Sequence, residues 1–302
     1  MHPPPAESGA ADWIFALNGG MEVRVTTTGY LQAGFWPESG LEAPYAFRVS
    51  PFSAGMLHDH NILYKFDADI LGTENTFTRL KIQLENVPAR WRNQPETVTQ
   101  RRLVTEYVDN EDNAALLYSM MQPEYWLILN RDAAKNKWGH ERGYRINSNG
   151  LIYSMTTHAD YIATRPMQWQ KYHIINTLYK DSEPFGSSMF ESVEAADPYL
   201  NLVDFIDGED IAQKDIVTWV NVGLHHIPHS EDVPVVVTPG ASVSVFFRPF
   251  NYFDEDPATD LLHSVYITPD GGVDHNGVED PTCLYEPEVP EFDGYSEAHS
   301  IE

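Results

Sequence analysis

The chain has 302 residues, of which 42% are apolar and 21% are charged, so it can form one or two domains with a sizeable core. Its formal net charge of −26 argues against nucleic acid or an anionic membrane as a partner, because both would repel an acidic protein. The single cysteine, Cys283, excludes an intrachain disulfide framework and cysteine-based zinc sites.

The first residues of the chain predict no ordered element. Residues 1–11 are rich in Pro, Ala and Gly and are expected to be disordered. They contain neither a basic nor an apolar stretch, so they do not predict a signal peptide. No run of about 18 apolar residues follows, so no transmembrane helix is predicted, and the compartment stays open.

From Asp12 onward, short runs rich in Val, Ile, Thr, Phe and Tyr predict β-strands. Polar and apolar residues alternate in these runs, and Gly- and Pro-containing turns separate them. The clearest runs are residues 21–36, 60–70, 216–224 and 241–250. Helical patterning is scarce, and residues 110–121 are the best candidate for a helix. The pattern therefore predicts an all-β fold, an antiparallel sandwich or barrel.

The end of the chain differs in composition from the strand-rich part. From Glu279 it contains eight acidic residues, several prolines and no Lys or Arg. Such a segment is typical of an extended surface strap or a loose end. We therefore expect a disordered segment 1–11, a β-sandwich over residues 12–278, and an acidic, Pro-containing tail over residues 279–302.

Two histidine clusters can hold a metal ion. His58 and His60 are two residues apart, so on a strand both imidazoles point to the same face. A second cluster, residues 225–229, follows a predicted strand and can supply a third imidazole. Three imidazoles without a thiolate suit copper(II) or zinc and leave positions open for water or dioxygen. The alternative is that these are solvated surface histidines.

A carboxylate pair follows the first histidine cluster. Asp67 and Asp69 share one strand face, Ala68 lies between them, and Asp215 lies beside another predicted strand. Hard oxygen ligands favour calcium rather than copper. These positions have odd numbers, whereas His58 and His60 have even numbers, so on an unbulged strand the two sets face opposite sides. The alternative is a solvated strand face.

Four segments resemble copper amine oxidases in the order found in that family. They are LHDHNILYKFDADILGTENTF (residues 57–77), WGHERGYRI (138–146), VTWVNVGLHHIPHSEDVPVVVTPG (217–240) and FFRPFNYFDEDP (246–257). The resemblance spans residue 12 to about residue 290, but it covers only the C-terminal part of the family's catalytic domain. It implies a large antiparallel β-sandwich, the family's supersandwich, truncated at the N-terminus.

The resemblance also implies three metal sites. The copper ligands would be His58, His60 and His226; His226 is preferred over His225, because the family places its third ligand directly before the Ile-Pro-His-x-Glu-Asp run. A structural calcium or manganese site would use Asp67, Ala68 (carbonyl), Asp69, Asp215 and Ile216 (carbonyl). A second, peripheral calcium site would use Phe205 (carbonyl), Asp207 and Glu209.

Family members oxidise primary amines with dioxygen to aldehyde, ammonia and hydrogen peroxide, and they form homodimers. They use topaquinone, which is made from a tyrosine in an Asn-Tyr-(Asp/Glu)-Tyr motif. Here the expected tyrosine falls near Glu7, and the motif occurs nowhere; Asn251-Tyr252-Phe253 is only a partial match. The family's catalytic aspartate lies further upstream still. We therefore assign no catalytic base and no quinone tyrosine.

The resemblance leaves several functions open. The leading expectation is a primary amine oxidase catalytic-domain portion that is inactive as the chain stands. The alternative is a non-catalytic copper-binding subunit or pseudoenzyme of the same fold. A cupin-type dioxygenase also uses a His-x-His pair, but cupins place a glutamate where Tyr64 and Lys65 stand. An acidic β-sandwich binding module without metal is the remaining alternative.

Overall fold

A computed structural model describes residues 8–36, 44–89, 97–158, 162–188, 190, 195–236, 241–260, 266–267 and 273–274. Contacts divide the chain into two units, Met1–Asp254 and Glu255–Glu302, which we describe separately. Across the described residues, no helix combines the length and the apolar character needed to cross a bilayer.

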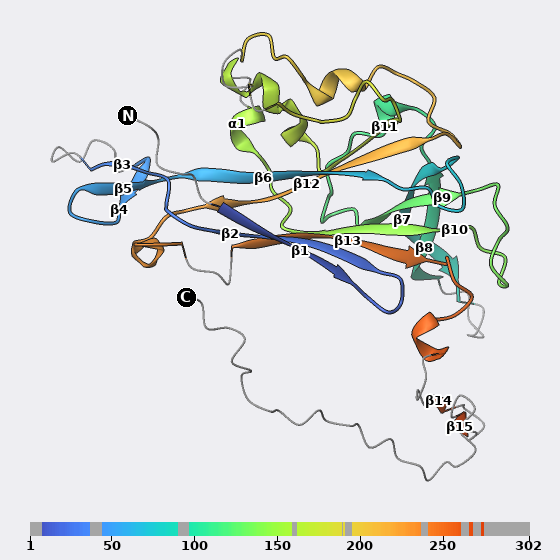
Figure 1. Cartoon of the computed structure of the whole chain (residues 1–302). Helices are drawn as coiled ribbons and strands as arrows, with labels where there is room; N and C mark the ends of the chain where they lie inside the picture. Colours follow the sequence, from blue (N-terminus) through green and yellow to red (C-terminus); the bar gives the residue numbers. More distant parts are fainter. Residues whose placement is uncertain are drawn as a thin grey trace, which may run out of the picture. The chain divides into compact units, whose positions relative to one another are not determined.

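The first unit is built on a seven-stranded antiparallel sheet (Figure 1). Its strand order is β1-β2-β13-β10-β9-β7-β8. The strands are β1 (Ser8–Phe15), β2 (Met21–Thr28), β7 (Thr76–Pro88), β8 (Thr97–Tyr107), β9 (Glu124–Asn130), β10 (Arg142–Asn149) and β13 (Ser242–Phe250). The alternating Val, Ile and Phe residues form strands here because one face of the sheet has a core to cover.

A second sheet of three strands lies across the first, and the two form a sandwich (Figure 1). Its order is β11-β12-β6, with β6 (His58–Asp67), β11 (Ile174–Leu178) and β12 (Ile216–His226). The even-numbered β6 residues Ile62, Tyr64 and Phe66 pack with Val243 and Val245 of β13 in the main core. This core fixes which face of β6 points into the sandwich.

The three-stranded sheet is also covered on its outer side. Trp169 and Leu202 lie against Val217 and Trp219 of β12 and form a second apolar cluster. They belong to the 3-10 helices η2 (Ile162–Lys171) and η3 (Leu202–Phe205). Burial on both faces explains why β12 is apolar along most of its length instead of alternating.

The remaining elements are short. β3 (Ala33–Phe35), β4 (Ala46–Arg48) and β5 (Ser53–Met56) form a small sheet in the order β3-β5-β4, directly before β6. The helices are α1 (Met155–His158), η1 (Glu111–Asn113) and η4 (Ser230–Asp232). The second unit contains η5 (Pro257–Asp260) and the paired strands β14 (Tyr266–Ile267) and β15 (Val273–Asp274).

The expected all-β sandwich is confirmed, whereas the helix predicted over residues 110–121 is wrong. That segment forms only η1, and Leu116 then pairs with Ile174 in a β-bridge, so its backbone serves a tertiary contact. β1 begins at Ser8, four positions before the expected start at Asp12, because β2 extends to Thr28 and provides a pairing partner. The tail over residues 279–302 lies outside the described residues.

Candidate metal centre

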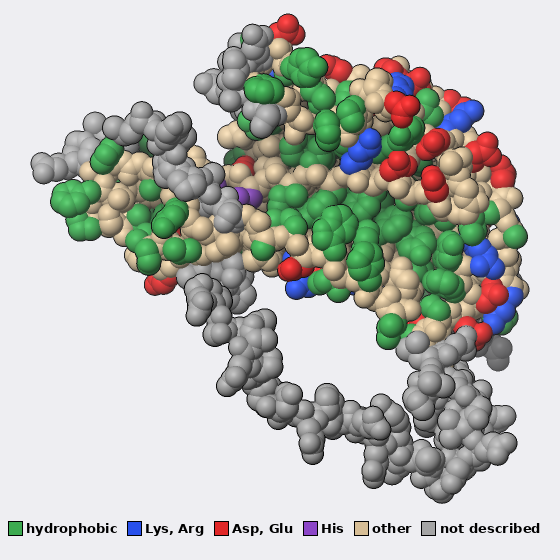
Figure 2. Space-filling view, viewed as in Figure 1, with side chains coloured by type: hydrophobic (Ala, Val, Ile, Leu, Met, Phe, Trp, Pro, Cys, Tyr) green, Lys and Arg blue, Asp and Glu red, His purple; other side chains and the backbone are tan. Residues whose placement is uncertain are grey.

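The pairing of β6 with β12 brings the two histidine clusters together. The strands are antiparallel, and their register places His226 opposite His58 and Leu224 opposite His60. The start of β6 therefore meets the end of β12. Because β6 carries its two histidines at alternate positions, all three imidazoles lie at this end of the ladder. Figure 2 shows histidine side chains at the surface at this end of the β6–β12 layer.

The three rings converge on one point. His58 Nε2 lies 3.1 Å from His60 Nε2 and 3.2 Å from His226 Nδ1. The ring centroids are 4.7 to 5.7 Å apart. Imidazole nitrogens bind zinc at about 2.0–2.1 Å, so two of them on one ion of that size stand about 3 Å apart. The spacing therefore fits three ligands of a single ion.

Hydrogen bonds decide which nitrogen of two of these rings faces the common point. His58 Nδ1 lies 2.7 Å from the Met56 carbonyl, which can only accept, so Nδ1 carries the proton and Nε2 presents a lone pair. His226 Nε2 lies 3.0 Å from Asp232 Oδ2, so His226 presents a lone pair at Nδ1. Lone pairs that face each other at 3.2 Å repel unless a cation lies between them. The donor set thus suits a bound metal ion.

Asp232 is the residue behind His226, and sequence reasoning did not single it out. It is 5% exposed, and its Oδ2 also accepts a hydrogen bond of 3.1 Å from the His229 backbone N–H. Burial raises the pKa of Asp232, but the hydrogen bonds from His226 and His229 outweigh it and hold this pKa below its usual range. The carboxylate is therefore ionised and can only accept, as the His226 tautomer requires.

The other two histidines of the second cluster take no part in the convergence. His225 pairs with Asp59 across the ladder, with its Nδ1 2.6 Å from Asp59 Oδ1, on the opposite face of the strands. His229 Nδ1 lies 3.0 Å from Asp232 Oδ2, and its side chain is 61% exposed. Position His226, not His225, is therefore the one that meets His58 and His60.

The predicted carboxylate site gathers at the opposite end of the same strand pair. Carboxylate oxygens of Asp67, Asp69 and Asp215 lie within 4.8 Å of one another. Burial and the neighbouring carboxylates raise the pKa values of Asp67 and Asp215. Asp67 pairs with Val217 of β12, and Asp215 and Ile216 are the two residues directly before Val217 in the chain. Both residues therefore lie beside Asp67. The Ala68 carbonyl accepts a hydrogen bond of 3.1 Å from Ile70 N–H and keeps a second lone pair.

A third carboxylate cluster combines predicted and unpredicted residues. Asp207 and Glu209 lie close to Glu111, with carboxylate oxygens again within 4.8 Å of one another. Phe205, expected to offer its carbonyl, ends η3 two residues before Asp207. Glu111 was not predicted, because it stands in the segment taken for a helix and 96 residues before Asp207. No local pattern could have found it.

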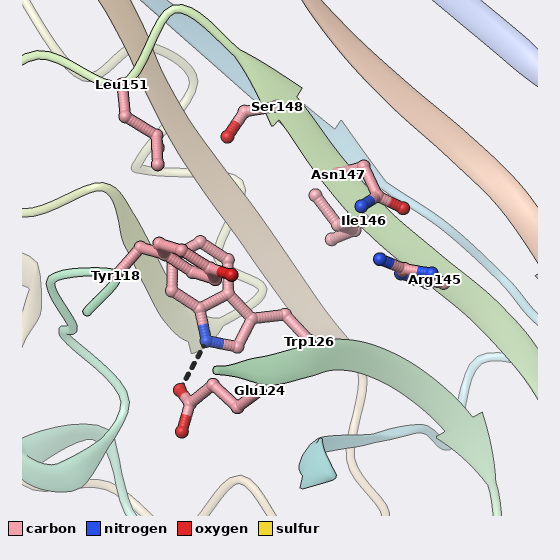
Figure 3. A pocket seen from close by; sticks show the side chains of 8 residues that line it. All are labelled: Tyr118, Glu124, Trp126, Arg145, Ile146, Asn147, Ser148 and Leu151. Atoms are coloured by element: carbon pink, nitrogen blue, oxygen red, sulfur yellow. Dashed lines mark hydrogen bonds between the residues drawn. The ribbon is translucent and has the colours of Figure 1, made fainter. Parts of the chain in front are cut away.

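A cavity of about 160 Å³ is lined by Tyr118, Trp126 and Leu151, among other residues (Figure 3). Part of its polar lining is engaged in hydrogen bonds and ion pairs, whereas Arg145 Nε is buried without a hydrogen-bond partner. The Trp126 indole N–H donates to Glu124 Oε1 over 2.7 Å, and Arg79 pairs with the same carboxylate over 2.8 Å. None of the predicted site residues lines it. We assign it no role in the chemistry.

Fold and geometry together define an antiparallel β-sandwich with a three-histidine centre where two paired strands meet. Residues 10–268 match the family described as "Copper amine oxidase, enzyme domain", and the chain belongs to that family. Membership of this family excludes the alternative of a cupin-type dioxygenase.

Individual relatives agree with the family match. The chain is 36% identical to a copper-containing diamine oxidase of Mus musculus over 266 residues, which is 87% of this chain and 35% of that protein. It is 34% identical to copper-containing amine oxidase 3 of Homo sapiens over 287 residues, which is 93% of this chain and 37% of that protein.

Solved structures share the fold. The crystal structure of an Aspergillus nidulans amine oxidase superposes with a TM-score of 0.77 at 26% identity, covering 93% of this chain and 39% of that one. Pichia pastoris lysyl oxidase gives 0.77 at 28% identity, covering 93% and 39%. The chain thus spans between a third and two-fifths of the length of these relatives.

Proposed function

We propose that this chain forms the copper-binding part of the catalytic domain of a copper-dependent primary amine oxidase. His58 and His60 would bind copper(II) through Nε2, and His226 would bind it through Nδ1. The observation that carries the proposal is the convergence of these three nitrogens, two of which have a tautomer set by Met56 and Asp232. Bound copper would supply redox chemistry with dioxygen.

The chain's own residues have a limited part in that chemistry. The histidines hold the ion and leave further coordination positions for water or dioxygen. The Met56 carbonyl and Asp232 keep one proton each on the outward nitrogens of His58 and His226. These second contacts fix ring orientation and raise the ligands' basicity. We assign none of them a role in abstracting a proton from an amine.

The activity proposed for the whole enzyme is oxidative deamination of a primary amine by dioxygen to aldehyde, ammonia and hydrogen peroxide. It depends on topaquinone, and the 302 residues contain no Asn-Tyr-(Asp/Glu)-Tyr. Tyr252, in the partial match, instead packs in an aromatic group with Tyr144 and Phe253, with ring centroids 5.2 and 5.0 Å away. We propose that a polypeptide of these residues alone binds copper but neither forms the quinone nor turns over amines.

Asp67, Asp69 and Asp215, with the carbonyls of Ala68 and Ile216, would form a structural site for calcium or manganese. The support is electrostatic: burial and then the neighbouring carboxylates raise the pKa values of Asp67 and Asp215, and a divalent ion would offset both effects. The second calcium site proposed from Phe205, Asp207 and Glu209 is taken up below. A homodimer is also part of the proposal and is testable by light scattering.

The alternative function is a non-catalytic copper-binding subunit or pseudoenzyme of the same fold. The observation that favours it is the combination of a complete histidine set with the absence of the quinone motif from the sequence. A part of an amine oxidase catalytic domain should form the quinone once it is joined to the segment that precedes the matched region in the relatives. A pseudoenzyme should form no quinone under the same conditions. The two functions agree on copper binding by these residues.

The test is copper loading of the purified 302-residue protein. We expect one tightly bound copper(II) per chain, a nitrogen-rich electron paramagnetic resonance signal, and no visible quinone absorption or phenylhydrazine adduct after exposure to dioxygen. Changing His58, His60 or His226 to Ala should each abolish tight binding. His225→Ala and His229→Ala are matched controls and should retain it. A protein that stays metal-free would instead favour the acidic binding module.

A further inference from the structure

The third carboxylate cluster already contains a cation of the protein's own. Lys180, just after β11, places its Nζ 2.5 Å from Glu209 Oε2 and 2.9 Å from Asp207 Oδ2. Glu183 Oε1 lies 3.4 Å from the same ammonium. The lysine side chain is 24% exposed, so it sits among these carboxylates rather than in open solvent. The ammonium group donates a hydrogen bond to Asp207 Oδ2 and forms ion pairs with Glu209 and Glu183.

The charge of Glu111, the third member of the cluster, is stabilised by hydrogen bonds rather than by an ion pair. Glu111 is fully buried, and its Oε2 accepts hydrogen bonds from the backbone N–H groups of Asp207 and Glu209 over 3.0 and 3.1 Å. Its Oε1 accepts another from Leu178 N–H over 2.9 Å. Three backbone donors stabilise a carboxylate as strongly as a nearby charge does. Glu111 therefore holds the 207–209 loop without requiring a metal ion.

These contacts do not fit a vacant calcium site. A calcium ion takes six to eight oxygen ligands at about 2.3–2.6 Å. Here both lone pairs of Glu111 Oε2 are engaged, and oxygens of Asp207 and Glu209 face an ammonium group.

We propose that Lys180 is the resident cation of this cluster and competes with a divalent ion for Asp207 and Glu209. The inference rests on the second calcium site of the proposed function, and it lowers the calcium affinity expected of that site. Calcium binds there only after Lys180 is displaced, so this site is much weaker than the one at Asp67. The loop is stabilised by the lysine when calcium is scarce.

The experiment measures calcium binding by titration calorimetry in a background without the first carboxylate site. In the Asp67→Asn, Asp69→Asn double variant, Lys180→Met should tighten calcium binding by tenfold or more. Lys180→Arg keeps the charge and should not tighten it. Lys135→Met, an exposed lysine on another loop, is the matched control and should also change nothing. Adding Glu209→Gln to the Lys180→Met protein should abolish the gained binding.

The outcomes separate this inference from the proposed function. Calcium binding that survives Asp67→Asn, Asp69→Asn at full strength would refute the first site; if Glu209→Gln then abolishes that binding, the second site is tight and the role of Lys180 is overturned as well. Unchanged affinity in the Lys180→Met protein, or tight binding at two sites in the wild type, would overturn the role of Lys180. Circular dichroism checks folding. If Lys180→Met does not fold without calcium, Lys180→Gln, which keeps a donor without the charge, is measured instead.

Discussion

Removing the Asp232 carboxylate should weaken copper binding without touching a ligand. Asp232→Ala deletes the carboxylate that accepts from His226 Nε2–H and from the His229 backbone N–H. His226 then loses the contact that fixes its tautomer and ring orientation. Second contacts of this kind are typically worth 10- to 100-fold in metal affinity, which is about 1.4–2.8 kcal/mol. We expect the upper half of that range, because Asp232 is 5% exposed and is not replaced by water.

The assay is a competition titration of copper(II) against a chelator of known affinity, with electron paramagnetic resonance as a second readout. Glu231→Ala is the matched control, since Glu231 neighbours Asp232 in η4 but is 80% exposed. Asp232→Asn keeps an acceptor oxygen and should lose less affinity than Asp232→Ala. Wild-type affinity and an unchanged spectrum in Asp232→Ala would refute the assigned tautomer of His226, and with it ligation through Nδ1.

Three further outcomes are expected. Asp67→Ala should leave copper binding intact and should abolish the stabilisation of the protein by calcium. That stabilisation is about 2.7 kcal/mol at a calcium concentration 100 times the Kd, and it is measured as the shift of the thermal midpoint. Loss of copper in this variant would show that the two sites are linked. Gly223→Ala should destabilise the protein by about 1–3 kcal/mol in urea unfolding, because a Cβ there would collide with the His60 carbonyl and meet Ile152 Cγ2 at 2.8 Å; a neutral change would contradict this close approach. Burial lowers the pKa of His173, against the raising effect of its bond to the Ile152 carbonyl, so the unfolded chain takes up a proton near pH 6.5 that the folded protein excludes. Stability is then complete above about pH 6.5 and falls by up to about 1.4 kcal/mol per unit below it; His173→Gln should flatten that slope in urea titrations at pH 5, 6 and 7, and an unchanged slope would assign it to other groups.

The strand β6 and its faces could be predicted from the sequence, because the period of two is visible in residues 60–70, whereas β12 is buried on both faces and does not alternate. The same period places His58 and His60 on one face and Asp67 on the other. The segment 110–121 could not be predicted, since its local pattern suggests a helix. Leu116 pairs with Ile174 instead, and that partner stands 58 positions further along the chain.

The supporting residues of the clusters were beyond sequence reasoning for a related reason. Glu111 accepts hydrogen bonds from the backbone N–H groups of Leu178, Asp207 and Glu209, and every residue type except proline can donate such a bond. Lys180 looks like any surface lysine until the fold brings the 207–209 loop beside it. Side-chain type and spacing identify ligands, whereas what neutralises or orients them depends on contacts between distant segments.

One ladder carries two of the three predicted cation sites, the histidine site and the Asp67 site. β6 begins with His58 and ends with Asp67, and antiparallel β12 runs from Ile216, beside Asp215, to His226. The two clusters therefore lie nine residues apart along β6, a separation of about 30 Å at roughly 3.3 Å per residue. A slip of one residue between the strands would separate His226 from His58 and Asp215 from Asp67 at the same time. Filling either site therefore stabilises the same register, although the two ions are too far apart to interact directly through salt-containing solvent. Substitutions confined to one site should add to those at the other, and a double-mutant cycle between His226→Ala and Asp67→Ala measures whether they do.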